Sequence, residues 1–252
     1  MRKQIPLFLN VPAGQSGLSE LAGRAEAAGL DAIVVPDGPP SAEPTVALAA
    51  LAASTERIGL IATLPAGCHD PLELARRVAD LDYLSNGRAG WRVAGGGLGH
   101  YFGAVQAGDE KPYAEAAVIA SVLARWDERT DLRSPQGRPV LVGGPNVRGA
   151  EVVLLEEWGL RALPGREPGA RVVLQQIGDI DPDRLENDFT AVDGFAFQPA
   201  DLERFFEEFL PELRRRGLLR SGYTTRTLRG HLGLEIPAAA VPASRSVLAG
   251  SR

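Results

Sequence analysis

The stretch EPTVALAALAASTERIGLIATL (Glu43–Leu64) decides the fold class, because it joins a helical pattern directly to a strand pattern. Pro44 is a residue that a helix tolerates in its first turn, and it opens the alanine- and leucine-rich run TVALAALAAST. Ile58–Leu64 is a short apolar run, as expected of a strand that is covered on both faces. A helix followed by a buried strand belongs to a βαβ unit, so the stretch predicts a parallel sheet.

The same alternation continues on both sides of this stretch. DAIVVPD (Asp31–Asp37) predicts the preceding strand, and Pro71–Leu84 predicts an amphipathic helix that leads to a strand from Gly90. Over the whole chain we expect strands at residues 5–11, 31–37, 58–64, 90–94, 139–144, 160–163, 171–180 and 194–198. The expected helices cover residues 18–28, 44–55, 71–84, 113–126, 147–158, 182–189 and 201–216.

This succession predicts an α/β protein with a (β/α)8 TIM-type barrel of parallel strands, in which the sixth and seventh units are short. A doubly wound open sheet shows the same alternation, so periodicity favours the barrel without excluding the open sheet. We expect a single domain over residues 1–235. Residues 236–252 are rich in Ala, Pro and Ser and are expected to form a flexible or surface tail.

The composition is that of an ordinary globular domain, with 44% hydrophobic and 23% charged residues and a net charge of −5. This mild acidity gives no electrostatic footprint for nucleic acid or for an anionic membrane. The single cysteine, Cys68, excludes a disulfide within the chain and a thiolate zinc site, and it suits a reducing cytoplasm. No apolar stretch approaches the roughly 20 residues that span a bilayer, and a strand explains the N-terminal run better than a signal peptide does.

Several motifs have a specific order along the chain: STERIGL from Ser54, PLELARR from Pro71, LDYLSNGRAGWR from Leu81, PVLVGGPNVRG from Pro139 and TLRGHLGL from Thr227. In this order the chain resembles the flavin-dependent, luciferase-like monooxygenases, and most closely the nitrilotriacetate and dibenzothiophene-sulfone monooxygenase branch. The resemblance implies a (β/α)8 barrel that binds reduced FMN from a partner flavin reductase and oxidises a small organic substrate with oxygen. The chain is shorter than that branch around the sixth and seventh units.

Relatives are usually dimers that pair through early helices, and Pro44–Thr55 is apolar almost all round, so we expect a homodimer.

The resemblance also implies positions for flavin contacts. Asp37 ends the second expected strand, where relatives have an acid that touches the flavin, although an acid here could equally cap a helix or a turn. Tyr113 matches the tyrosine of the family's HDERY motif, whereas Asp109 replaces its histidine, and an acid would repel a flavin phosphate. Tyr113 could also simply pack at the start of its helix.

A phosphate site is expected after the fifth strand. Gly143 and Gly144 permit close backbone approach, Asn146 stands where relatives have a phosphate-binding serine, and Arg148 could add charge. The expected helix from Val147 would point its free N–H groups at this turn. A plain helix N-terminus capped by Asn146 needs no ligand, and it is the alternative.

Two histidines, His69 and His100, fall in loops at the expected catalytic face, and either could act as a general base or be merely exposed. Cys68 is either a small buried hydrophobe or a group that meets a flavin intermediate. After the third strand Pro65 and Ala66 stand in place of the family's hydroxyl residues, and Arg92 opens a stretch that relatives write NVVTS.

These departures indicate an eroded flavin site and leave two hypotheses. One is an FMN-dependent, two-component monooxygenase, in which the flavin is weakly held. The other is a non-catalytic barrel of the same family that acts as a partner subunit or as a flavin- or small-molecule-binding protein.

Overall fold

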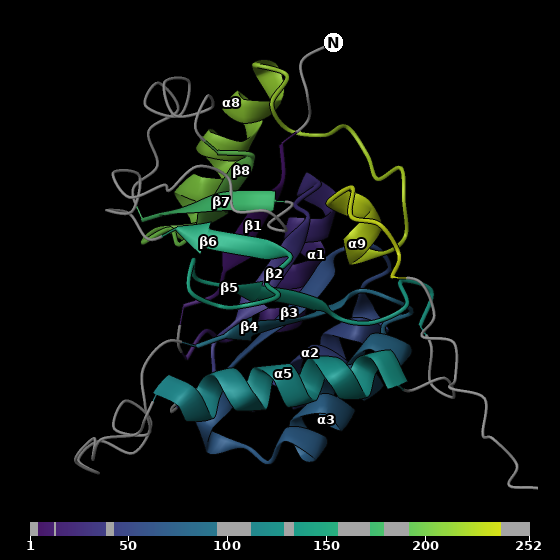
Figure 1. The fold of residues 1–252 in the computed structure, drawn as a ribbon. Helices are drawn as coiled ribbons and strands as arrows, with labels where there is room; N and C mark the ends of the chain where they lie inside the picture. Colours follow the sequence, from purple (N-terminus) through teal and green to yellow (C-terminus); the bar gives the residue numbers. More distant parts are fainter. Residues whose placement is uncertain are drawn as a thin grey trace, which may run out of the picture.

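The apolar runs of the chain form eight strands, all parallel, that close into one barrel in the order β1 to β8 (Figure 1). The computed structural model describes residues 5–12, 14–38, 43–94, 112–128, 134–155, 172–178 and 192–237. The strands are β1 (Leu7–Asn10), β2 (Ala32–Val35), β3 (Gly59–Leu64), β4 (Ala89–Val93), β5 (Val140–Gly143), β6 (Val152–Leu155), β7 (Val172–Ile177) and β8 (Gly194–Phe197). β1 pairs with both β2 and β8, which closes the ring. The predicted barrel is confirmed, and the open sheet is excluded.

The helices lie outside the barrel and at one of its ends. They are α1 (Leu18–Ala28), α2 (Pro44–Ser54), α3 (Pro71–Leu84), α5 (Pro112–Glu128), α7 (Leu202–Arg204), α8 (Leu210–Arg215) and α9 (Leu228–His231). Short helical segments η1 (Ala66–Cys68) and η3 (Phe205–Phe209) accompany them, and the expected helix 201–216 is α7, the π-helical η3 and α8 in succession. In Figure 1 α2, α3 and α5 lie on one side of the barrel and α8 on the other.

Helix starts follow the sequence signals. Pro44 is the first residue of α2, and the side chain of Glu43 accepts from the Val46 N–H at 2.9 Å, which satisfies a free amide of the first turn. Asp70 does the same for α3, whose first residue is Pro71. The predicted limits of helices 18–28 and 71–84 therefore match α1 and α3.

Side chains on each strand alternate between the inside and the outside of the barrel. The outward set packs with the surrounding helices and includes Leu9, Leu60 and Trp91. The inward set, with Phe8, Ile61 and the remaining strand residues of the second cluster, packs only with other strands and with the C-terminal segment. Every barrel strand is thus buried on both faces, which explains why the strands read as continuous apolar runs.

One end of the barrel is closed by α9. The Leu228 side chain enters between β3 and β4, and it comes so close to Gly59 that a Cβ there would lie 2.5 Å from Leu228 Cδ1. This helix was not expected from the sequence. It fills the end where the strands begin, so the other end, where the strands finish, is the face available for a site.

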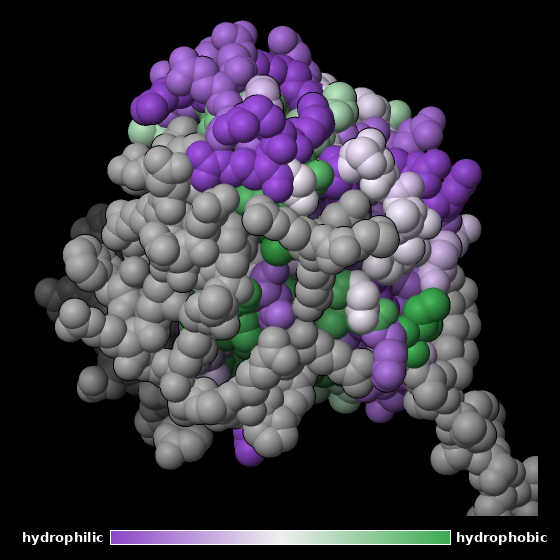
Figure 2. Space-filling view, turned by 90° about the horizontal axis from the view of Figure 1, so that it is seen from above, coloured by the Kyte–Doolittle hydropathy of each residue, from purple (hydrophilic) through white to green (hydrophobic). Residues whose placement is uncertain are grey.

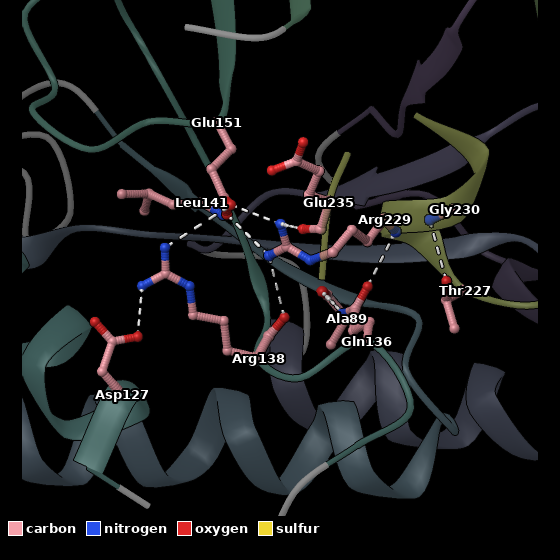
Figure 3. A network of polar contacts seen from close by, with 10 residues as sticks. All are labelled: Ala89, Asp127, Gln136, Arg138, Leu141, Glu151, Thr227, Arg229, Gly230 and Glu235. Carbon is pink, nitrogen blue, oxygen red and sulfur yellow. Dashed lines mark hydrogen bonds and ion pairs between the residues drawn. The ribbon is translucent and has the colours of Figure 1, made fainter. Parts of the chain in front are cut away.

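A polar network holds the segment that carries α9 (Figure 3). Arg229 is 1% exposed and forms two contacts with the Glu151 carboxylate, at 2.6 and 3.1 Å. Its backbone N–H donates to Gln136 Oε1 at 3.0 Å, and the Gln136 amide in turn donates to the Ala89 carbonyl. β4, the residue that precedes β6 and the C-terminal segment are therefore tied together at the closed end of the barrel.

The expected helix at 147–158 is wrong. The chain turns after β5, with Val147 N–H donating to the Gly144 carbonyl at 3.0 Å, and it enters β6 at Val152. A short apolar run fits either element by periodicity, and the two adjacent β-branched valines at the start of VVLL favour a strand. The sixth strand is consequently Val152–Leu155 and not residues 160–163, which lie outside the described residues together with the expected helix 182–189.

Of the expected tail, only Ile236 and Pro237 fall within the described residues, and Ile236 is 62% exposed. Among the helices that the structure describes, none combines the length and hydrophobicity that a bilayer crossing requires.

Candidate functional site

Polar side chains occupy the last inward positions of the strands, at the open end of the barrel. Asn10 follows Phe8 on β1, Thr63 follows Ile61 on β3, and Arg92 is the inward residue of β4 next to Val93. Gln176 and Gln198 take the same place on and after β7 and β8. The alternation of a buried strand brings these five side chains to one level, and we name them the inner ring.

Hydrogen bonds join four members of the inner ring. Arg92 donates to Asn10 Oδ1 at 3.2 Å and to Gln176 Oε1 at 3.1 Å. The Gln176 amide donates to Gln198 Oε1 at 3.0 Å, which extends the ring to an exposed residue. Both of these acceptors are neutral amide oxygens, and the two contacts fix the orientation of the Arg92 guanidinium.

Two buried polar atoms of the inner ring lack a hydrogen-bond partner among the described residues: Asn10 Nδ2 and Thr63 Oγ1. Asn10 is only 5% exposed, so water reaches its amide poorly. A buried donor without a partner costs on the order of 1–3 kcal/mol. Such atoms are uncommon in folded proteins, and they mark places where a ligand or a water molecule can bind.

A second polar group, which we name the rim cluster, comprises Asp37, Glu43 and His69 on the connections after β2 and β3 and Arg77 on α3. Glu43 accepts from Thr45 Oγ1 at 2.6 Å and pairs closely with Arg77. Burial alone would raise the pKa of Glu43. The pKa nevertheless lies below its usual value, because Thr45 and Val46 donate hydrogen bonds to the carboxylate and Arg77 lies beside it. This pair fixes the start of α2 against α3 at the edge of the mouth.

His69 is half-buried, and its Nε2 atom is buried with no hydrogen-bond partner in the described part of the chain. Burial, and next the charge of Arg77, lower the pKa of His69, while Asp37 and Glu43 oppose this. The imidazole is therefore neutral near pH 7. A neutral imidazole with a free ring nitrogen can accept or donate a proton, which is what a general base or acid requires.

Asp37 accepts from the Gly38 N–H at 2.8 Å, so the carboxylate stabilises its own turn, whereas the cap of α2 is Glu43. Burial raises the pKa of Asp37, against the effect of the Gly38 hydrogen bond. One carboxylate oxygen makes this contact, and the predicted contact with a flavin stays a prediction.

The predicted phosphate site lacks the helix from Val147 on which it was based, and phosphate binding itself stays a prediction. No helix begins after β5, so Gly143 and Gly144 do not face a set of free helical N–H groups. The space beside Gly143 is filled by Val147, because a Cβ at Gly143 would lie 2.6 Å from Val147 Cβ. Asn146 and Arg148 are exposed on the turn.

Three further predicted positions are described in part or not at all. His100 lies outside the described residues. Tyr113 lies in the first turn of α5 and Cys68 in η1, but their side chains are not among the described ones. The described residues contain no group of three His, Cys, Asp or Glu side chains that could hold a metal ion.

No sequence motif indicated a role for Asn10, Gln176 or Gln198, and Arg92 stood out only as a departure from relatives. A usable signal was present, because each of these polar residues ends an apolar strand at an inward, even-spaced position. Their meeting depends on barrel closure, which joins Arg92 to Asn10 across 82 residues of sequence.

Comparisons with known proteins agree with this architecture. The family model described as luciferase-like monooxygenase matches residues 10–151. Nitrilotriacetate monooxygenase component A of Aminobacter aminovorans is 39% identical over 108 residues, which cover 40% of this chain and 23% of that protein. The matched segment thus spans about a quarter of the relative's length.

Two solved structures are similar in fold. EDTA monooxygenase from Chelativorans sp. BNC1 superposes with a TM-score of 0.73 at 17% identity and covers 92% of this chain and 99% of that chain. A riboflavin lyase, solved with modified FMN and riboflavin, superposes with a TM-score of 0.72 at 20% identity, covering 93% of this chain and 97% of that chain. At these identities the likeness concerns the fold alone.

Proposed function

Because this chain belongs to the luciferase-like monooxygenase family, we propose that it is a two-component monooxygenase, which takes reduced FMN from a flavin reductase and oxidises a small organic substrate with oxygen. The observation that carries the proposal is the mouth of the barrel. There a neutral histidine with a free ring nitrogen, His69, lies on the loop after β3, and the polar inner ring lies at the strand ends.

The residues present fit the ring system of a flavin better than its phosphate. The polar edge of the isoalloxazine carries carbonyl oxygens and one N–H, and His69 Nε2 is a buried atom that lacks such a partner among the described residues. The same loop contains Pro65 and Ala66 where relatives have hydroxyl side chains, so at these two positions only backbone groups could bind the flavin. The turn after β5 lacks the helix N-terminus that was expected to bind the phosphate.

Reduced FMN, when bound, would supply the oxidising power by reacting with oxygen and passing one oxygen atom to the substrate. The chain's own part is to bind, orient and move protons. His69 would hold or release a proton at Nε2, and Asp37 and Glu43 would stabilise the imidazolium when it forms. The apolar walls of the barrel below the inner ring would keep water from the reacting atoms.

The proposal includes the expected assembly and place of action. The outer side of α2 exposes Val46 (66%), and the adjacent α3 exposes Leu72 (54%), which favours a homodimer through these helices. On the face seen from above in Figure 2, the side opposite α3, hydrophilic residues gather over the upper part of the view. We propose that the protein works in the cytoplasm, which suits a chain with one cysteine.

A second candidate, a barrel that binds flavin or another small molecule without catalysis or serves as a partner subunit, is favoured by one observation. The β5–β6 connection is a turn without a helix, so it lacks the helix N-terminus that was expected to hold a flavin phosphate.

Anaerobic titration with reduced and oxidised FMN tests the proposal. We expect saturable binding of reduced FMN, and His69→Gln should weaken it about tenfold if the ring nitrogen meets the flavin, since one lost hydrogen bond in a buried site costs about 1.4 kcal/mol. The matched control is His231→Gln, because His231 lies on α9 at the closed end of the barrel. Absence of binding for the folded protein would contradict the monooxygenase, and it would leave only a partner subunit or a barrel that binds another small molecule.

A further inference from the structure

The top layer of the barrel interior is formed by four residues, one from every second strand: Asn10, Thr63, Gly144 and Gln176. In a (β/α)8 barrel such a layer gains about two residues with every second strand. Asn10 pairs with Val34, and Val34 pairs with Ile61, two residues before Thr63. The same step leads from Gln176 back to Asn10, so the layer closes round the barrel. We name these four residues the top layer.

Asn10 has hydrogen-bond donors that the described residues do not use. Its Oδ1 atom accepts from Arg92 at 3.2 Å, and because a guanidinium only donates, this contact fixes which end of the amide carries Nδ2. The Nδ2 atom is buried and has no partner among the described residues, and Asn10 is only 5% exposed. A buried amide therefore keeps free N–H donors in the top layer.

The Thr63 hydroxyl is the second unused group of the top layer. Its Oγ1 atom is buried and lacks a hydrogen-bond partner within the described ranges. Only β2 separates β3 from β1, so the backbones of Thr63 and Asn10 lie about 10 Å apart along the sheet. One ligand oxygen between them can accept from both residues, since both side chains reach inward and a hydrogen bond spans about 3 Å.

The position of the top layer at β5 carries no side chain. Thr63 pairs with Arg92 and Arg92 with Val142, two residues before Gly144, so Gly144 faces the barrel interior. A Cβ added at Gly144 would meet no atom of the described residues within 4 Å. In the closed ring of eight strands β5 lies opposite β1. Space is therefore open across the barrel from Asn10.

Below the top layer, the inward side chains of β2, β6 and β8 are apolar and buried: Val34, Leu154 and Ala196. Arg92 rises from the same lower level, but it already contacts Asn10, Gln176 and a further group, so we assign it no ligand. The donors left over are uncharged. Burying a carboxylate against uncharged donors costs far more than burying a carbonyl group. The place therefore fits a ligand with an uncharged oxygen acceptor and an apolar body.

We propose that the top layer binds the carbonyl oxygen of an uncharged ligand through Asn10 Nδ2 and Thr63 Oγ1, with the apolar part of the ligand in the space beside Gly144. That this ligand is the substrate, a neutral carbonyl compound, rests on the proposed monooxygenase function, while the binding itself does not. The carbonyl edge of a bound flavin has the same acceptor chemistry, and the experiment separates the two sources.

The test is a titration of the isotope-labelled, flavin-free protein with cyclohexanone, followed by nuclear magnetic resonance through the side-chain amide signals of Asn10. These signals should shift saturably. Cyclohexene has a similar ring without an acceptor, and cyclohexanecarboxylate would bury a charge against neutral donors, so both should bind at least about tenfold more weakly. Asn10→Asp keeps an acceptor for Arg92 and removes both donors. Its affinity for cyclohexanone, followed through backbone amides, should fall at least about tenfold.

Thr63→Val and Thr55→Val form a matched pair, because valine keeps the shape of threonine and removes the hydroxyl. The Thr55 hydroxyl, which precedes β3 at the closed end of the barrel, donates to the Leu51 carbonyl at 2.7 Å and accepts from Arg88 at 2.8 Å. Thr55→Val should therefore lower the urea midpoint and leave the affinity for cyclohexanone unchanged. Thr63→Val should weaken that affinity severalfold without lowering the urea midpoint, since no described group uses its hydroxyl.

The inference would be overturned by the absence of a saturable shift with cyclohexanone, by equal or tighter binding of cyclohexene or cyclohexanecarboxylate, or by unchanged affinity in Asn10→Asp. An equal loss of stability in the two threonine variants would also overturn it, because the protein would then use the Thr63 hydroxyl itself.

A parallel titration with reduced FMN separates this result from the proposed function. If reduced FMN binds and cyclohexanone does not, only the carbonyl site fails. If cyclohexanone binds and reduced FMN does not, the monooxygenase fails and the carbonyl site stands. If reduced FMN displaces cyclohexanone, and Asn10→Asp weakens both, the carbonyl edge of the flavin occupies the top layer and the assignment to the substrate is overturned.

Discussion

Replacing Arg229 by methionine should destabilise the protein strongly, because Arg229 ties the C-terminal segment to the closed end of the barrel. The guanidinium is 1% exposed and makes two contacts with Glu151, at 2.6 and 3.1 Å, and one with the Glu235 carbonyl at 3.1 Å (Figure 3). Methionine keeps most of the volume and removes every one of these contacts.

The magnitude follows from what remains around Glu151. Breaking a buried ion pair from one side costs about 3–5 kcal/mol, because the other charge is left without its partner. Glu151 keeps Arg138 at 3.8 Å, and its side chain is 14% exposed, so the cost should lie at the lower end, about 3 kcal/mol. For a chain of this size that corresponds to a fall in Tm of about 6–12 °C.

The assay is urea unfolding followed by far-ultraviolet circular dichroism, with thermal melts in parallel. The control is Arg76→Met, since the Arg76 ion pairs on α3 are exposed and should contribute less than about 0.5 kcal/mol. The double variant Arg229→Met with Glu151→Leu removes both charges and should recover much of the loss. A single variant as stable as the control, or a double variant that loses the sum of two large effects, would refute the reasoning.

Three other perturbations have outcomes set by the structure. Burial raises the pKa of Asp82 to about 6, above its value in the unfolded chain. The contribution of Asp82 to stability is therefore present in acid and is lost as the pH rises from about 4 through 6. Asp82→Asn can keep all three hydrogen-bond contacts, and it should reduce this loss of stability when urea midpoints are measured at both ends of the pH range. Val46→Glu should shift the expected dimer toward monomer in light scattering, whereas a wild-type monomer at micromolar concentration would contradict the dimer. Asn146→Ala with Arg148→Ala should leave the affinity for reduced FMN unchanged within about twofold, because both side chains are exposed on a turn; a large loss in a titration would restore the phosphate site.

Much of the fold could be predicted because its elements are locally encoded. Helices α2 and α3 begin at prolines preceded by capping acids, and their strands are short apolar runs between turns. The helix predicted from Val147 failed because Val152–Leu155 is too short for periodicity to decide, and barrel pairing with β5 and β7 selects the strand. Tertiary pairing thus overrode a local pattern.

The candidate site was harder to predict, because it is assembled by closure. His69 and Asp37 could be located from their places after β3 and β2. The contact of Arg92 with Asn10 joins β4 to β1, and no local pattern indicates that these two side chains meet. Arg77 likewise lowers the pKa of His69 only because α3, which carries Arg77, packs beside the loop that carries His69.

The most direct test of the monooxygenase proposal is to follow the reoxidation of reduced FMN by oxygen, with the protein and without it. Hydrogen peroxide is measured at the same time, because it is the product of the uncoupled reaction in which no substrate is oxidised. If the barrel mouth binds reduced FMN and excludes water, the time course should differ from that of free flavin, peroxide release should be slower, and His69→Gln should return both toward the free-flavin values. Identical time courses and peroxide yields with and without saturating protein would contradict a catalytic flavin site in this chain.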